Sequence, residues 1–398
     1  MAKSSKSKKR KKMSKSEKTT SKNVVPYKEK DLASEVLDDG YIDVMEDKTV
    51  SLFVVGDVIL PNLTEKSELS EEEITQSLLE EIPEISDYCN LDTVKQFRFR
   101  GNIPTPAMML DLSKSIQKAL SNPDVAGVVV TQAPDAIEES AYFVSISLSD
   151  KFQNSNSKPI VFTSAMFSDV PFHDGGRNLL DSVRTACHDG KGDIPTVVIC
   201  MNSEIHAASR AQISHTINAA ALSSPGWGPV GYADKDRVYF RAGALELDTG
   251  LNFPTPKRLS ASVEIIKAQT GDTGLMVDAA VKAGADALII EGFGRGNLPG
   301  GMMPSIKKAL KKGVLVVIAT RAASGRVLDS GDYCGSVTEC LDLGCLLAGE
   351  TTAAKARLLM MYILSQKDAA ALRKSDEERF LAYVQECLDP VLSVRLFE

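Results

Sequence analysis

Short apolar runs rich in Val and Ile recur along the chain and alternate with amphipathic segments. Seven runs are predicted to be strands: 51–55, 125–131, 159–163, 196–201, 263–267, 287–291 and 314–320. Apolar residues at three- and four-residue spacing predict helices over 110–120, 275–283 and 305–310. Continuous apolar strands alternating with helices are typical of a parallel sheet covered on both faces, so the sequence predicts an α/β protein.

Breaks in this pattern suggest how the chain is divided. We expect a larger N-terminal parallel-sheet domain over 49–241 and a smaller C-terminal α/β domain over 261–366. Residues 242–260 interrupt the alternation with the run Asn252-Phe253-Pro254-Thr255-Pro256, which is typical of a linker. Residues 367–398 are expected to form a helical C-terminal extension.

Composition adds a charge asymmetry to this picture. The 398 residues carry 46 Lys and Arg against 53 Asp and Glu, whereas residues 1–30 carry 12 Lys and Arg against two acidic residues. Such a segment cannot bury apolar surface, so residues 1–31 are expected to be a disordered basic tail. The run Lys8-Lys9-Arg10-Lys11-Lys12 is open to four interpretations: a nuclear-import address, a nucleic-acid contact, an anchor to an anionic surface, or a solubilising tail.

Two further observations concern the cellular setting. The sequence has no stretch of 18 uncharged apolar residues and the tail has no apolar core of a secretory signal, so we expect no membrane span. Seven cysteines without a CxxC pair favour reduced thiols, in the cytosol or the nucleus, and argue against a zinc site.

The loops after the predicted strands carry the most specific sequence signals, because ligands of open α/β sheets bind beyond the carboxyl ends of the strands. The relevant segments are QAPDAIEESAYF (132–143), HDGGRNLLDSV (173–183), VVICMNSEIHAASRAQISHT (197–216), IIEGFGRGNLP (289–299) and LAGETTAAKARLL (347–359). In this order they resemble the L-asparaginase/glutaminase family, the bacterial and archaeal-type amidohydrolases with a threonine nucleophile.

The resemblance implies a fold, an assembly and a chemistry. It implies the two-domain asparaginase fold, a dimer or tetramer, no cofactor, and hydrolysis of the side-chain amide of asparagine or glutamine through an acyl-enzyme. A second Thr, a Lys and an Asp would assist the nucleophilic Thr, and backbone N–H groups would hold the oxyanion.

Several of these functional positions hold other residues in this chain. Asp57 stands at the nucleophile, Pro134 at the second Thr and Ile213 at the Lys, whereas Asp135 is retained and Thr105 matches a substrate-binding Ser. Proline offers neither a hydroxyl nor an N–H, and isoleucine removes the cation. The leading hypothesis is therefore a pseudoenzyme, because positions 57, 134 and 213 do not hold the catalytic residues of the family. Its role would be structural, that of a scaffold, or amino-acid-responsive.

Three alternatives stay open at this point. The first is a residual or altered amidohydrolase, which would use another hydroxyl, from Thr64 or Ser164. The second is a protein that binds a ligand through Thr105 and Asp135 without turnover. A carboxylate pair between Asp57 and Asp135 is less favoured than a helix-capping role for Asp135. The segment 205–216, with its two histidines, is expected to be a surface helix.

Overall fold

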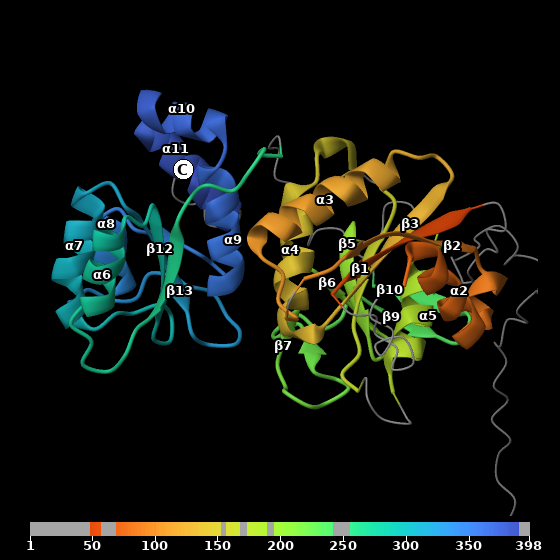
Figure 1. Cartoon of the computed structure of the whole chain (residues 1–398). Helices are drawn as coiled ribbons and strands as arrows, with labels where there is room; N and C mark the ends of the chain where they lie inside the picture. The colour runs from red at the N-terminus through yellow and green to blue at the C-terminus, as the bar shows by residue number, and fades with distance from the viewer. Residues whose placement is uncertain are drawn as a thin grey trace, which may run out of the picture. The chain divides into compact units, whose positions relative to one another are not determined.

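A computed structural model describes residues 48–56, 69–99, 101–152, 157–167, 173–188, 195–241 and 255–389. The tail, Asp57, Thr64, most of the expected linker (242–254) and residues 390–398 lie outside this part. The described residues belong to one compact unit that spans 40–398. We call residues 48–241 the N-terminal lobe and residues 255–389 the C-terminal lobe (Figure 1).

The N-terminal lobe is built on an eight-stranded sheet, counting the described strands. Its order is β10-β9-β6-β5-β4-β3-β1-β2. The strands β2, β1, β3, β4 and β5 are mutually parallel, whereas β6, β9 and β10 add antiparallel pairs at one edge. The bounds are β1 (Thr49–Val55), β2 (Asn90–Phe97), β3 (Val125–Gln132), β4 (Ile160–Thr163), β5 (Val197–Met201), β6 (Glu204–Ala207), β9 (Gly231–Asp234) and β10 (Arg237–Phe240).

Helices cover both faces of this sheet because successive side chains of a strand point to opposite faces. Leu52 and Val54 of β1 pack in one cluster with α2 (Glu71–Glu81) and α5 (Gly175–Ala186). Phe53 and Val55 pack in another with α3 (Pro106–Leu120) and α4 (Ile137–Ser147). The run of consecutive apolar residues in β1 therefore fills two cores.

The C-terminal lobe repeats this architecture around four parallel strands in the order β11-β12-β13-β14. One face carries α6, α7 and α8, and the other packs against α9 and α11. The bounds are β11 (Val263–Lys267), α6 (Leu275–Ala283), β12 (Ala287–Gly292), α7 (Met303–Lys311), β13 (Leu315–Thr320), α8 (Val337–Asp342), β14 (Leu346–Leu347), α9 (Ala353–Leu364), α10 (Lys367–Ser375) and α11 (Glu377–Leu388).

The lobes meet mainly where α4 packs against α9 (Figure 1). Phe143 of α4 and Tyr362 of α9 are both fully buried, and their rings meet edge to face at 6.0 Å. At the rim of this contact, Arg210 donates to Glu350 at 2.9 Å, and its guanidinium lies 4.2 Å from the ring centre of Trp227.

The C-terminal helix α11 closes the outer edge of the small sheet. The Gln385 amide donates to the Leu347 carbonyl at 2.9 Å, and its oxygen accepts from the Leu347 N–H at 2.8 Å, as a neighbouring strand would. Asp389, at the end of the helix, receives two hydrogen bonds from Arg326, at 2.6 and 2.8 Å.

The predicted fold class is confirmed, and all seven predicted strands and all three predicted helices are present. The large sheet is mixed rather than entirely parallel, because β6, β9 and β10 run antiparallel. The expected surface helix over 205–216 was wrong. That segment contains strand β6 and the short strand β7 (Gln212–Ile213), which pairs with β8 (Leu222–Ser223). None of the described helices is long and apolar enough to cross a bilayer.

Candidate functional site

The candidate site lies at the carboxyl ends of β1, β3 and β4. The register pairs Val55 at the end of β1 with Gln132 at the end of β3, and Thr131 with Thr163 at the end of β4. The three strands therefore end side by side, and the segments that follow them start from one edge of the sheet. Asp57 follows β1 but lies outside the described residues.

Thr105 is the N-cap of α3. Its side-chain oxygen accepts the Met108 N–H at 3.3 Å, and the residue is exposed. The preceding Pro104 is buried and lines an enclosed crevice with Val55 and Ser140, too narrow to hold a water molecule. The start of α3 therefore lies close to the end of β1 and to the N-terminal part of α4.

Pro134 and Asp135 form the short 3-10 helix η2 (Pro134–Ala136) between β3 and α4. Pro134 is half-buried and starts the turn, where its missing N–H is tolerated. Asp135 is exposed, and α4 begins at Ile137 after Ala136, without a side-chain cap. The prediction that Asp135 caps this helix was therefore wrong, and its carboxylate faces solvent.

Ile213 belongs to β7 and is held against α4. Its backbone N–H donates to Glu138 Oε2 at 2.6 Å, and its half-buried side chain packs against the apolar cluster of α3, α4 and the sheet. The structure thus brings position 213 to the first turn of α4, one turn after Pro134. An aliphatic side chain occupies the place at which the family resemblance implies a lysine.

An ionic cluster lies behind this segment, formed by the buried Lys355 and the half-buried Glu138 and Glu139, whose carboxylates attract its charge. Lys355 of α9 is 1% exposed, and its Nζ donates to the carbonyls of Ala211 at 2.6 Å and Ser209 at 3.2 Å. Burial lowers the pKa of Lys355 to about 7, against the opposing attraction of both carboxylates. Burial also raises the pKa of Glu138, opposed by the charge of Lys355. The cluster fixes residues 209–213 from the other lobe.

The sequence interpretation missed this cluster because its members lie more than 200 residues apart. The available signal was Lys355 itself, a cation within the otherwise apolar face of the segment AAKARLLMMYIL. A lysine at such a position needs a buried partner, since an isolated buried ammonium is very costly.

A second polar arrangement joins three residues in the order of a hydrolytic triad. His206 Nδ1 lies 2.9 Å from Ser224 Oγ, and Nε2 lies 3.3 Å from Glu204 Oε2. Ser224 is only 4% exposed, whereas Glu204 is at the surface, with 37% of its side chain exposed. Burial lowers the pKa of His206, opposed by Glu204. A nucleophile must reach its substrate, and Ser224 is buried. We therefore assign the Ser224–His206–Glu204 arrangement a structural role.

Four buried side chains near the strand ends have polar atoms without hydrogen-bond partners in the described structure: Thr131, Gln132, Ser140 and Ser164. Ser164, one of the two hydroxyls considered as a substitute nucleophile, is 0% exposed. The other, Thr64, lies outside the described residues. Ser164 could attack a carbonyl only after the surrounding chain opened.

The described part of the site has a limited chemical repertoire. It offers the exposed Asp135 carboxylate, the Thr105 hydroxyl and the backbone groups of the loops, which suit binding of a small polar molecule. Within the described ranges, no three His, Cys, Asp or Glu side chains gather closely enough to hold a metal ion.

Comparison with protein families matches both lobes. The family model "Asparaginase, N-terminal" matches residues 49–245, and "Glutaminase/Asparaginase C-terminal domain" matches residues 262–374. Similar proteins include the L-asparaginase of Bacillus licheniformis, 29% identical over 320 residues, which cover 80% of this chain and 96% of that protein. The L-asparaginase 2 of Bacillus subtilis (strain 168) is 30% identical over 316 residues, 78% of each chain.

A solved structure has the same fold. The probable cytoplasmic L-asparaginase of Campylobacter jejuni superimposes with a TM-score of 0.67 and 24% sequence identity, covering 85% of this chain and 99% of that one. The likeness extends over both lobes, in agreement with the two family models. On this agreement of sequence and fold, the chain belongs to the asparaginase family.

Proposed function

We propose that this protein uses the asparaginase fold without the threonine–lysine amidase chemistry, and that it serves as a structural, scaffold or amino-acid-binding protein. The observation that carries the proposal is the environment of Ile213, which packs its side chain into an apolar cluster and offers only its backbone N–H to a polar partner. A proton relay cannot run through this position. Pro134 has no hydroxyl to polarise a water molecule.

Ammonia release from L-asparagine and L-glutamine tests the proposal with the full chain. We expect no release above a protein-free blank. A triple variant, Asp57→Thr with Pro134→Thr and Ile213→Lys, restores the residue types of the family and should gain turnover if the scaffold is intact. Ammonia release by the unaltered chain that disappears in Asp57→Asn would overturn the proposal.

Binding without turnover is the specific role that the remaining groups support. Thr105 and Asp135 keep a hydroxyl and a carboxylate at the carboxyl ends of the strands. Calorimetric titration with L-aspartate, L-asparagine and L-glutamine should therefore give heat that is lost in Asp135→Ala. The absence of both heat and a thermal shift would leave only the structural or scaffold role.

An L-asparaginase-type amidohydrolase with residual or altered activity is the second candidate. The comparisons favour it, since both bacterial relatives described above are named as L-asparaginases. It requires a nucleophile other than the usual Thr, and a diazo-ketone analogue of the amino acid would label that group covalently. Mass spectrometry of the labelled chain would identify the residue, and a failure to label at high protein concentration would count against this candidate.

The basic run Lys8–Lys12 would have a separate role, either as a nuclear-import signal or as an anchor to an anionic surface. Co-sedimentation with vesicles that contain phosphatidylserine, with and without residues 1–31, tests the anchor. Binding that does not depend on these residues would exclude it. Assembly into a dimer or tetramer, which the resemblance implies, is tested by sedimentation velocity.

A further inference from the structure

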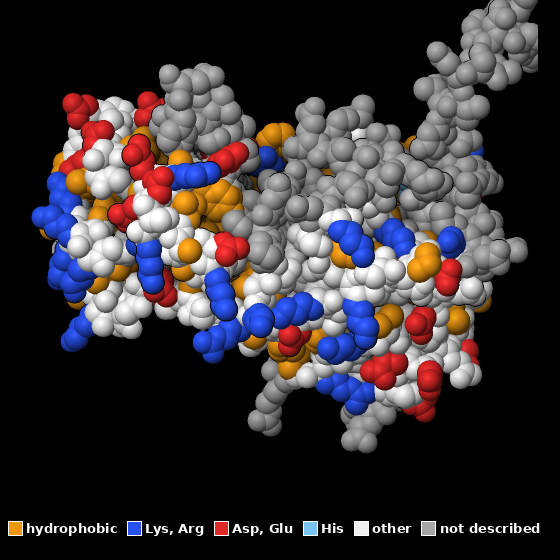
Figure 2. All heavy atoms as spheres, turned by 90° about the horizontal axis from the view of Figure 1, so that it is seen from above, with side chains coloured by type: hydrophobic (Ala, Val, Ile, Leu, Met, Phe, Trp, Pro, Cys, Tyr) orange, Lys and Arg blue, Asp and Glu red, His pale blue; other side chains and the backbone are white. Residues whose placement is uncertain are grey.

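Two cysteines of the N-terminal lobe lie side by side although they are far apart in the sequence. Cys89 stands directly before β2, and Cys187 is the C-cap of α5. Charged side chains are spread over the described part of the face drawn in Figure 2, whereas these two residues are only 4% and 1% exposed. Both belong to the apolar cluster that α2 and α5 form with the sheet, and their side chains share a hydrogen bond.

The neighbouring residues hold the two cysteines in this contact. The guanidinium of Arg184, in the last turn of α5, lies 5.0 Å from the ring centre of Tyr88. Tyr88 directly precedes Cys89 in the chain, so this stacking ties the first cysteine to the end of α5. At that end the Cys187 N–H donates to the Val183 carbonyl at 2.9 Å. The backbone is therefore fixed on both sides of the place where the thiols meet.

The two thiols differ in their readiness to ionise. The Cys187 thiol donates a hydrogen bond to the Cys89 sulfur and lowers the pKa of Cys89; burial opposes this effect, and the backbone N–H of Val50 in β1 is a second donor. The same contact with Cys89, together with burial, raises the pKa of Cys187. The thiolate is the nucleophilic form of cysteine, so Cys89 reacts first while Cys187 stays protonated beside it.

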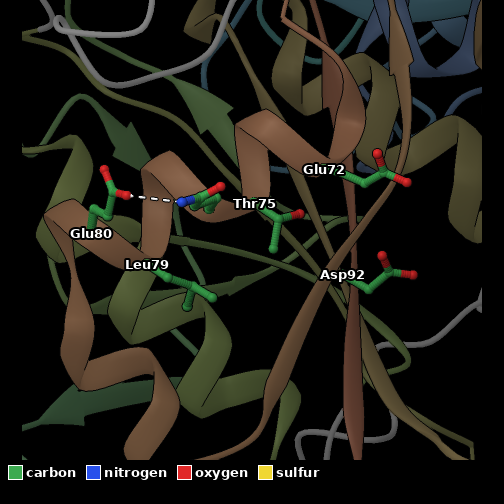
Figure 3. Close-up of a pocket in the computed structure, with 6 residues that line it drawn as sticks. Glu72, Thr75, Leu79, Glu80 and Asp92 are labelled. Atoms are coloured by element: carbon green, nitrogen blue, oxygen red, sulfur yellow. Dashed lines mark hydrogen bonds between the residues drawn. The ribbon is translucent and has the colours of Figure 1, made fainter.

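A small oxidant can approach this pair from the edge of the sheet. Leu79 of α2 packs against the apolar cluster that contains both thiols, and it is only half-buried. Figure 3 shows Leu79 among the side chains that line a surface pocket of about 480 Å³ between α2 and β2. Solvent therefore reaches the outer side of this cluster near the start of β2. A thiol with so little exposure admits only a compact reagent, and hydrogen peroxide is one.

We propose that Cys89 and Cys187 form a reversible redox site, in which hydrogen peroxide converts the two thiols into a disulfide between the start of β2 and the end of α5. The Cys89 thiolate attacks a peroxide oxygen and becomes a sulfenic acid; the O–O bond breaks, and the departing hydroxide takes up the proton that Cys89 lost. The Cys187 sulfur then attacks the Cys89 sulfur, the S–O bond breaks, and water leaves with the proton of Cys187. Two thiols and one peroxide thus give one disulfide and two waters.

The cross-link acts on the stability of the N-terminal lobe and is independent of whether the candidate site hydrolyses an amide. It closes a loop of about 100 residues, and a link of that length strongly restricts the unfolded chain. Cys340 and Cys345 of the C-terminal lobe share a similar hydrogen bond, but they are close in the sequence, so a disulfide between them would restrict the unfolded chain much less. Oxidation at Cys89 and Cys187 therefore gives one fold a second, higher level of stability.

Peptide mapping of the full chain under non-reducing conditions tests the proposal, after the native protein has reacted with a small excess of hydrogen peroxide. We expect a cross-linked peptide that joins Cys89 to Cys187 and that dithiothreitol converts back to two thiols. The melting temperature of the oxidised chain should rise by about 5 °C or more, because the cross-link restricts the unfolded state. This rise should be absent in Cys187→Ser.

Single variants test the order of the two steps. In Cys187→Ser the sulfenic acid has no second thiol to react with, so dimedone should label Cys89 after peroxide, whereas in Cys89→Ser it should leave Cys187 unlabelled. The matched control Cys334→Ser removes an exposed cysteine and should form the cross-link unchanged. The absence of the cross-linked peptide, labelling of Cys187 in Cys89→Ser, or a lower melting temperature after oxidation would each overturn the proposal. Thermal melting of the reduced variants confirms that they fold.

Discussion

The ionic cluster around the buried Lys355 leads to a quantitative prediction. Lys355→Met keeps most of the aliphatic stem but removes the Nζ group, which donates to Ala211 and Ser209 and lies near Glu138. The carbonyls of Ala211 and Ser209 then lose their donor, and Glu138 loses the attraction of a nearby positive charge. Leaving a buried acceptor without its donor typically costs about 1–3 kcal/mol, and we expect a loss of that size at pH 7.

Urea unfolding followed by circular dichroism measures this loss, and hydrogen exchange of the amides in 209–213 locates it. The control is Lys308→Met, whose ammonium pairs with Asp278 at 2.9 Å but is 57% exposed, so its loss should change the stability much less than that of Lys355. Glu138→Gln keeps an acceptor for the Ile213 N–H. The double variant Lys355→Met/Glu138→Gln should therefore recover part of the loss.

The pH dependence gives an independent check. In the folded chain burial lowers the pKa of Lys355 from 10.5 to about 7, so between these values the unfolded chain holds the proton and the folded chain does not. Stability from this group consequently rises with pH above 7, by at most about 1.4 kcal/mol per pH unit. The gap between the unaltered chain and Lys355→Met should widen from pH 7 to pH 9. A cost below about 1 kcal/mol at pH 7, or strictly additive double-variant costs, would refute the reasoning.

Three other predictions concern stability. Gln385→Ala should cost about 2–4 kcal/mol in urea unfolding, because it leaves both backbone groups of Leu347 without partners; a cost near zero would mean that the edge of β14 is satisfied otherwise. Gly335→Ala should cost about 3 kcal/mol or more, since φ is +84° and a Cβ would stand 2.0 Å from a carbonyl oxygen. The control Gly271→Ala, with φ of +78° and no atom near the added Cβ, should cost about 1 kcal/mol. Similar melting temperatures of the two variants would contradict this. His206→Asn should reduce the loss of stability on acidification from pH 7.5 to 5.5, because burial lowers the folded pKa of His206 and the unfolded chain takes up the proton first; parallel pH profiles would show that the imidazole does not contribute.

Sequence patterns predicted the buried strands well but not the peripheral ones. A strand buried on both faces needs consecutive apolar residues, and this produced runs such as those of β3 and β13. Strand β2 was not predicted, because it lies at the sheet edge, where few residues are buried and Asp92 and Lys95 face solvent. The antiparallel strands β9 and β10 have four residues each and give too short a pattern.

The candidate site was predicted only as far as local sequence could identify it. The sequence placed Pro134 and Asp135 after the strand 125–131, where η2 follows β3, and the structure adds that Thr105 is the N-cap of α3. It could not show that Ile213 packs into an apolar cluster, or that Lys355 reaches the same segment from the other lobe. Both facts depend on contacts between distant parts of the chain, which no local pattern encodes.

The stacking of Trp227 on Arg210 has a practical consequence for following this molecule in solution. Trp227 is the only tryptophan in the sequence and is 45% exposed, and the guanidinium beneath it also holds Glu350 of the C-terminal lobe. Its fluorescence emission therefore comes from one place, the rim where the lobes meet. A shift in its wavelength or intensity would report a rearrangement there, without any label attached to the protein.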